Sequence, residues 1–146
     1  MRKELIYRPA TITENSIVFQ GLLSFIYPDK IPTVFPTLHA LVPVLDAAYK
    51  YEMKGVMGAL STQLISRTSG EGKIGSGLMQ QNPVWVYAKA KHLGLDEVAS
   101  VAAKATLNID ITIQPRDNPD IANMPASWLW DLLALRPKQN RSRRVE

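Results

Sequence analysis

Cysteine is absent from the 146 residues, and histidine occurs only twice, at His39 and His92. The lack of cysteine excludes disulfides, cysteine-based zinc sites and a thiol nucleophile. The two histidines belong to different predicted helices and lack the i, i+4 spacing of a helical zinc pair. Catalysis needs a nucleophile with a base, a pair of acids or a metal, and no such set stands out. We therefore predict no enzymatic activity, no catalytic residue, no metal site and no cofactor.

Long apolar runs are also missing. No segment approaches the roughly 20 apolar residues of a membrane-spanning helix, and the opening stretch, MRKELIYRPATITEN, lacks the apolar core of a signal peptide. These absences predict a cytoplasmic or nuclear protein with no membrane partner. Hydrophobic residues make up 46% of the chain and charged residues 21%, a composition that is sufficient for a buried core.

The formal net charge is +4, and much of the excess lies at the end of the chain. Five Lys and Arg residues fall within nine positions there: Arg136, Lys138, Arg141, Arg143 and Arg144. Such a tail favours nucleic-acid phosphates or a nuclear-localisation signal, but a solvated chain end is the simpler interpretation. No aromatic residue is interleaved with the arginines, so a stacking platform for single-stranded nucleic acid is not predicted. With the simpler interpretation, nucleic acid is not the expected partner.

The stretch from Leu38 to Leu64 predicts two short amphipathic helices. Because proline is tolerated only in a first helical turn, Pro43 predicts that the first helix begins near Leu41 or Val42, with His39 in an approach turn. An apolar stripe follows at helical spacing: Leu41, Val44, Leu45, Ala48 and Tyr51. Gly55 is the predicted break. The second helix carries Val56, Met57, Leu60 and Leu64 on one face.

An earlier helix is predicted from Asn15, a good N-cap, to Tyr27 before Pro28. Its predicted buried face is Phe19, Leu22, Leu23 and Ile26. Residues 29–36 contain further prolines and predict an irregular loop. Residues 66–77 predict a flexible glycine-rich linker. Its glycines at 70, 72 and 75 match GxGxxG, but a helix instead of a strand precedes them, so nucleotide binding is not predicted.

The pair Asn82-Pro83 predicts the start of a helix that runs to Leu93 and is closed by Gly94. Asp96 is predicted to cap the next helix, so the two form a hairpin in which Trp85 and Tyr87 are packing residues. The following helix has the stripe Val98, Val101, Ala102 and Ala105. Residues 108–125 predict an extended connector. Residues 127–135 predict a last helix, covered by the preceding hairpin.

The order of these features resembles BTB/POZ domain proteins of the type found in filamentous fungi. The resemblance rests on LLSFIYP (Leu22–Pro28), on VLDAAYKYEM (Val44–Met53) and on the segment Asn82–Leu107. It implies a mainly α fold: a helical bundle resembling the C-terminal half of a BTB/POZ domain, followed by a helical hairpin. Residues 1–66 would be the partial domain, 67–81 a glycine-rich linker or insertion, 82–135 the helical extension and 136–146 the basic tail.

The resemblance also implies a function. Family members are protein–protein interaction modules, and some recruit a cullin scaffold as ubiquitin-ligase substrate adaptors. Carried over to matching positions, the contact residues are Tyr27, Pro28, Asp29, Met53, Lys54 and Met57. The N-terminal half of the family domain, which carries much of the homodimer interface, has no counterpart here, so self-association is left open. The alternatives are a nuclear or nucleic-acid-associated protein acting through the basic tail, and a truncated family member without independent function.

Overall fold

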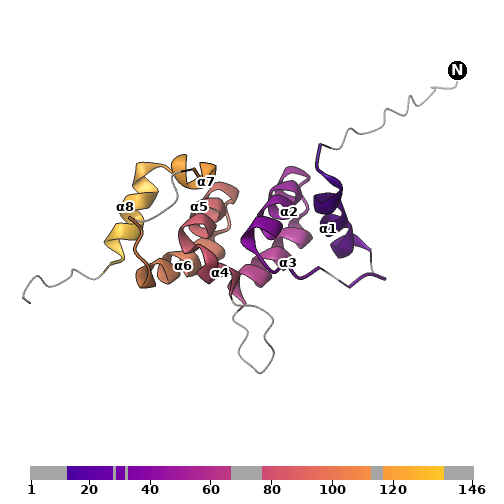
Figure 1. The fold of residues 1–146 in the computed structure, drawn as a ribbon, viewed down its shortest axis with the longest axis horizontal. Coiled ribbons are helices and arrows are strands. Elements are labelled where there is room, and N and C mark those ends of the chain that lie inside the picture. Colours follow the sequence, from indigo (N-terminus) through magenta and orange to yellow (C-terminus); the bar gives the residue numbers. More distant parts are fainter. Residues whose placement is uncertain (1–12, 28, 32, 67–76, 113–116, 137–146) are drawn as a thin grey trace, which may run out of the picture.

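The computed structural model describes residues 13–27, 29–31, 33–66, 77–112 and 117–136 (Figure 1). These residues form helices and no strand, which confirms the mainly α class. The elements are α1 (Ser16–Ile26), α2 (Leu38–Lys50), α3 (Lys54–Ile65), α4 (Leu78–Gln81), α5 (Pro83–Leu93), α6 (Asp96–Ala105), the 3-10 turn η1 (Thr106–Asn108), α7 (Pro119–Ala122) and α8 (Ala126–Ala134). Pro28, residues 67–76 of the predicted linker and residues 137–146 of the predicted tail lie outside the described residues.

The helices follow one another along an elongated molecule. Helices α1 to α3 form one end, α5 to α8 form the other, and the short α4 lies between them (Figure 1). The two groups are not separate cores, because Leu38, Leu45 and Leu64 of the first group line the same apolar interior as Val86 and Val98 of the second. The predicted partial domain and the predicted helical extension therefore share one continuous core.

Helix α2 begins three or four residues earlier than predicted. Thr37 is its N-cap, with a side-chain oxygen that accepts a hydrogen bond from Ala40 N at 3.3 Å. His39 consequently lies in the first turn, and Pro43 lies inside the helix, where it provides no N–H for the carbonyl of His39. The prediction of a later start was wrong because burial of Leu38, which is 1% exposed, outweighs this missing hydrogen bond.

The break between α2 and α3 also lies earlier than Gly55. Helix α2 ends at Lys50, and Glu52 takes the positive φ of 55° that a glycine normally supplies. Gly55 is instead part of the first turn of α3. The predicted break was wrong because a non-glycine residue holds the left-handed position, at a cost of about 1–2 kcal/mol.

We expect Glu52→Gly to raise the free energy of unfolding by about 0.5–1 kcal/mol, because glycine relieves the left-handed strain but adds entropy to the unfolded chain. Urea denaturation followed by circular dichroism measures the change. Glu52→Ala is the matched control, since it removes the carboxylate and keeps the Cβ. Equal stability of the two variants would contradict the strain.

Helix α1 buries only part of the predicted face. Its buried residues are Val18, Gly21, Leu22 and Ser24, whereas Ile26 is 51% exposed. A Cβ at Gly21 would lie 3.1 Å from Val44 Cγ2, so this glycine permits close approach of α1 to α2. The prediction was right for Leu22 and wrong for Ile26, because α1 has apolar residues on nearly all sides and the spacing alone does not select one face.

A polar clamp joins the start of α1 to the end of α2. The Glu14 carboxylate accepts hydrogen bonds from Lys50 Nζ at 2.8 Å and from Tyr51 Oη at 2.6 Å. The hydrogen bond from Lys50 is the largest cause that lowers the pKa of Glu14 from 4.5 to about 2. The start of α1 therefore lies beside the end of α2, and the two helices are antiparallel.

Because the pKa of Glu14 is lower in the folded chain than in the unfolded chain, its ionised form stabilises the fold above pH 4.5. That contribution is lost as the pH falls toward 2. We expect Glu14→Gln to be less stable than the unsubstituted chain near neutral pH, and the difference to shrink through this window. Urea denaturation at a series of pH values measures it, and a difference that is independent of pH would contradict the clamp.

The second group of helices follows the predicted hairpin. The Asn82 side chain accepts from Trp85 N at 3.1 Å to cap α5, and Gly94 closes the helix with a φ of 71°. Asp96 is the first residue of α6 and provides no side-chain cap, so its predicted capping role was wrong. In place of an extended connector, the described part of residues 108–125 contains the short helix α7.

Candidate functional site

The six residues that the resemblance implies as contacts do not form one surface. Tyr27 is the C-cap of α1 and is 54% exposed, and Asp29 is also exposed. Met53 and Met57, at the start of α3, are half-buried and pack against the core, whereas Lys54 is exposed. Pro28 lies outside the described residues.

Tyr27 and Asp29 lie at one end of the layer formed by α1, α2 and α3. Met53, Lys54 and Met57 lie at the other end. The start of α3 follows the end of α2, which is clamped to Glu14 before α1. At the other end, Gln63 near the end of α3 bonds to the loop that follows α1: its Oε1 accepts from Phe35 N at 3.2 Å, and its Nε2 donates to Thr33 O at 2.8 Å. A helix length, about 16 Å, therefore separates Tyr27 from Met53.

The end near Tyr27 is rich in exposed apolar side chains. Helix α1 contains no charged residue. Four large apolar residues at the end of α1 and in the loop after it are more than half exposed: Ile26, Tyr27, Ile31 and Val34. Exposed apolar surface of this kind is typical of protein–protein contact sites. We call these four residues the α1 surface.

Helix α8 exposes a second apolar stripe at the opposite end of the molecule. Leu132 is fully buried, and Trp128 lies against His92 of α5 with ring centroids 4.9 Å apart. The preceding hairpin therefore covers one side of α8, as predicted. Trp130 is nevertheless 69% exposed, and Leu129 and Leu133 are about 40% exposed, so the hairpin leaves the other side open.

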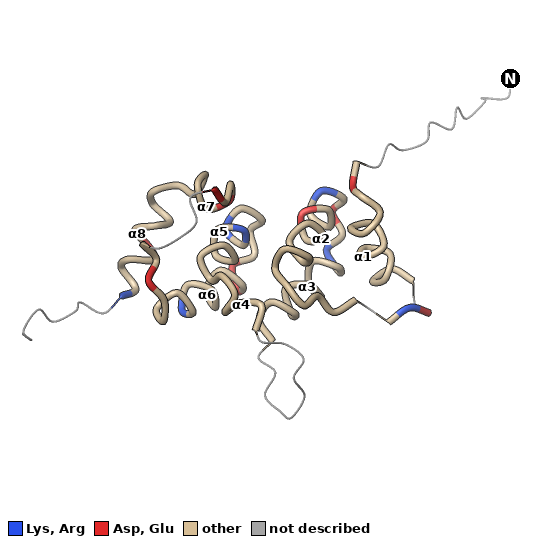
Figure 2. Tube along the Cα trace, in the orientation of Figure 1, with Lys and Arg blue, Asp and Glu red and all other residues tan. Residues whose placement is uncertain are grey.

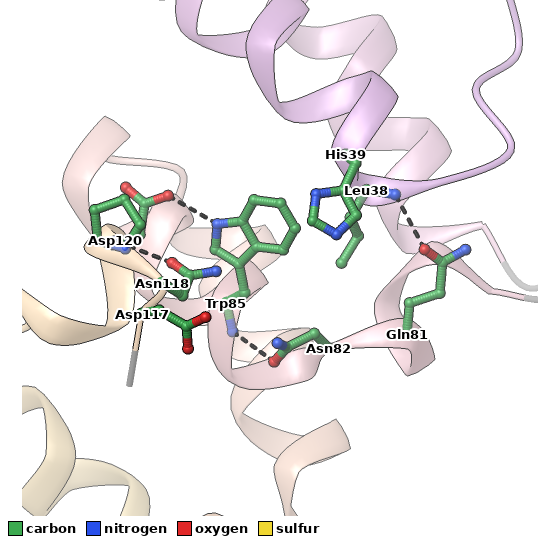
Figure 3. A pocket seen from close by; sticks show the side chains of 9 residues that line it. Leu38, His39, Gln81, Asn82, Trp85, Asp117, Asn118 and Asp120 are labelled. Carbon is green, nitrogen blue, oxygen red and sulfur yellow. Dashed lines mark hydrogen bonds between the residues drawn. The ribbon is translucent and has the colours of Figure 1, made fainter. Parts of the chain in front are cut away.

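A cavity of about 430 Å³ lies where the start of α2, the start of α5 and the start of α7 meet (Figure 3). The Trp85 indole stands between His39, whose ring centroid is 5.0 Å away, and Asp120, whose Oδ2 accepts from Trp85 Nε1 at 2.8 Å. The remaining lining residues are Leu38, Gln81, Asn82, Asp117, Asn118 and Pro119. Trp85 is thus both a packing residue, as predicted, and a wall of this cavity.

A nearly buried lysine, Lys89, forms ion pairs that join the helices around the cavity. Lys89 of α5 donates to Asp46 Oδ1 of α2 and lies 2.9 Å from Asp120 Oδ1 of α7. Its side chain is only 11% exposed. Burial lowers the pKa of Lys89, but the hydrogen bonds to Asp120 and Asp46 outweigh it, and the pKa is raised overall. Lys89 therefore stays charged and connects the two groups of helices.

The charge of the described residues differs from that of the whole chain. Acidic residues outnumber basic ones among the described residues, whose charges Figure 2 shows. The positive excess of +4 therefore comes from the rest of the sequence. Arg136, the first residue of the predicted tail, is half-buried and donates to the carbonyls of Thr106 at 3.2 Å and Ile109 at 2.6 Å. It therefore anchors the end of α8.

The described residues show no metal site and no membrane span. No group of three or more His, Cys, Asp or Glu among them is placed to hold a metal ion. Within the same residues, no helix is long and apolar enough to cross a bilayer.

Comparisons with known proteins give no relative for this chain: no family model, no curated protein and no solved structure matches it.

The part of the cavity formed by α7 was not predicted from the sequence. Asn118 caps this helix, because its Oδ1 accepts from Asp120 N at 3.0 Å and Ile121 N at 3.3 Å, and Pro119 is the first helical residue. This is the same Asn-Pro signal that predicts the start of α5 at Asn82. At residues 118–119 the neighbouring prolines and alternating isoleucines favour an extended connector instead, and this stronger pattern gave the wrong prediction.

Proposed function

We propose that this chain is a protein–protein interaction module of the BTB/POZ type, that it acts in the cytoplasm or nucleus, and that its partner is a cullin scaffold. The identity of the partner rests on the sequence resemblance. The observation that carries the interaction role is the α1 surface, which contains four large apolar side chains, each more than half exposed. Leaving such a surface in water is unfavourable, and a bound partner removes the cost.

The position of the α1 surface favours some of the predicted contact residues over others. Tyr27 belongs to it, and Asp29 follows directly in the chain. Met53 and Met57 contribute packing to the core, which limits the area that they offer to a partner. We therefore assign the main contact to the α1 surface, and only an accessory contact to Lys54 at the other end of the layer.

The test compares two double variants in a calorimetric titration with a cullin N-terminal domain. Ile26→Ser combined with Tyr27→Ser removes two exposed apolar side chains of the α1 surface. Trp130→Ser combined with Leu133→Ser removes two from α8 and is the matched control. We expect the first to weaken binding at least about tenfold and the second to leave it unchanged, because contact residues near the centre of an interface dominate affinity.

A third variant tests the contact on α3. Lys54→Glu reverses the charge of an exposed side chain without disturbing the packing of Met53 and Met57. We expect a loss of affinity smaller than that of the α1 double variant. Equal affinities for the unsubstituted chain and the α1 double variant would contradict the assignment of the contact to the α1 surface.

A further inference from the structure

The cavity beside Trp85 contains hydrogen-bonding groups that the fold does not use. Asn82 and Asn118 each use the side-chain oxygen to cap a helix, which leaves the amide NH₂ of each as a donor. Gln81 is occupied at both ends, since its Oε1 accepts from Leu38 N and its Nε2 donates to Pro36 O. Asp120 is likewise occupied, by Trp85 and Lys89.

Asp117 is the one carboxylate of the cavity lining that has no partner among the described residues. It is exposed, and Figure 3 shows it beside Asn118 on the side of Trp85 away from His39. Among the described residues no Lys or Arg lines the cavity, and Lys89 is paired with Asp46 and Asp120. The described lining therefore offers a carboxylate without a paired cation beside an aromatic ring.

This combination selects the charge of a ligand. A guanidinium or ammonium group pairs with a carboxylate through charge-assisted hydrogen bonds, and it is also attracted to the face of an indole ring. An anionic ligand would meet Asp117 with no cation in the described part of the lining. The NH₂ groups of Asn82 and Asn118 suit carbonyl acceptors, and a peptide presents these next to its side chains. The volume of about 430 Å³ falls within the usual range of small binding sites.

We propose that the cavity binds an Arg or Lys side chain from a partner protein segment, with Asp117 pairing with the cation, Trp85 packing against it, and Asn82 and Asn118 donating to the adjacent peptide carbonyls. The proposal rests on the proposed function, since it adds a second contact to an interaction module. The cavity lies between α2, α5 and α7 and shares no residue with the α1 surface.

The test titrates the ¹⁵N-labelled full chain with N-acetyl-arginine amide and follows the Trp85 indole N–H resonance, assigned with single Trp→Phe variants. We expect a saturable shift, and none with N-acetyl-citrulline amide, which has the same shape without the charge. Asp117→Asn should weaken the apparent affinity about fivefold. Asp131→Asn, which removes an exposed carboxylate of α8, is the matched control and should have no effect. Equal shifts with the two probes, or in the two variants, would overturn the proposal.

A further variant tests whether the basic tail of this chain, instead of a partner, occupies the cavity. The full chain with Arg141, Arg143 and Arg144 each replaced by glutamine should give the same Trp85 resonance and the same affinity for the probe. A displaced resonance together with tighter probe binding would show that the tail occupies the cavity, and would overturn assignment to a partner. Neither titration contains a cullin, and both leave the α1 surface intact, so their failure would leave the proposed function standing.

Discussion

Leu45→Ala should lower the free energy of unfolding by about 2–5 kcal/mol, because it removes a side chain that is 1% exposed and leaves a cavity in the core. Leu45 of α2 lines the apolar interior together with Val86 and Ala90 of α5 and Val98 of α6. The loss should therefore affect both groups of helices. This is the largest effect that we expect from a single substitution.

The positions of the three tryptophans allow unfolding of the second group of helices to be followed separately. Trp85, Trp128 and Trp130 all belong to the second group of helices, whereas Leu45 belongs to the first. If the chain unfolds as one unit, Leu45→Ala lowers the urea midpoint by the same amount in tryptophan fluorescence and in circular dichroism. Gln20→Ala, on the exposed side of α1, is the control and should change neither midpoint. An unchanged fluorescence midpoint in Leu45→Ala would show that the two groups are independent.

Lys89→Ala should lower the free energy of unfolding by about 2–3 kcal/mol. The substitution removes a nearly buried stem that packs at the junction, and it leaves the Asp46 and Asp120 carboxylates without their cation. Asp46 is about half exposed, so the loss should stay below that of a fully buried ion pair. Denaturation in urea near neutral pH measures it.

Two variants separate the charge of Lys89 from its packing. Lys89→Met keeps an apolar stem, so it should recover part of the stability lost in Lys89→Ala. Lys104→Ala removes an exposed lysine of α6 and should change stability by less than about 0.5 kcal/mol. A loss in Lys104→Ala as large as that in Lys89→Ala would show that net charge, and not the ion pairs at the junction, sets the effect.

Local signals in the sequence predicted the helices well. Asn15 caps α1 by accepting from Val18 N at 2.9 Å, and the Asn82-Pro83 start and the Gly94 end of α5 are as predicted. These features depend on a few neighbouring residues, which is why the sequence alone reveals them. The predicted stripes of α2 and α3 are buried, apart from Met57, which is half-buried, and Tyr51, which is 41% exposed. Three further buried residues of α2 were not predicted: Leu38, Val42 and Ala47.

The errors at the face of α1 and at the cavity have a different origin, because both features depend on contacts distant in sequence. The face of α1 is set by the fit of Gly21 against Val44, which no helical spacing reveals. The cavity brings together residues 38–39, 81–85 and 117–120, so its aromatic and acidic lining exists only in the folded chain. The proposed contact residues could be listed from a resemblance, but their separation to opposite ends of the α1–α3 layer required the structure.

Light scattering after gel filtration is the most direct test of the interaction module, for the full chain alone and mixed with a cullin N-terminal domain. We predict one defined species that gains the mass of the cullin domain on mixing. A defined species whose mass the cullin leaves unchanged would contradict the proposed partner. Heterogeneous aggregates of the chain alone would contradict the claim that these helices form a self-contained module.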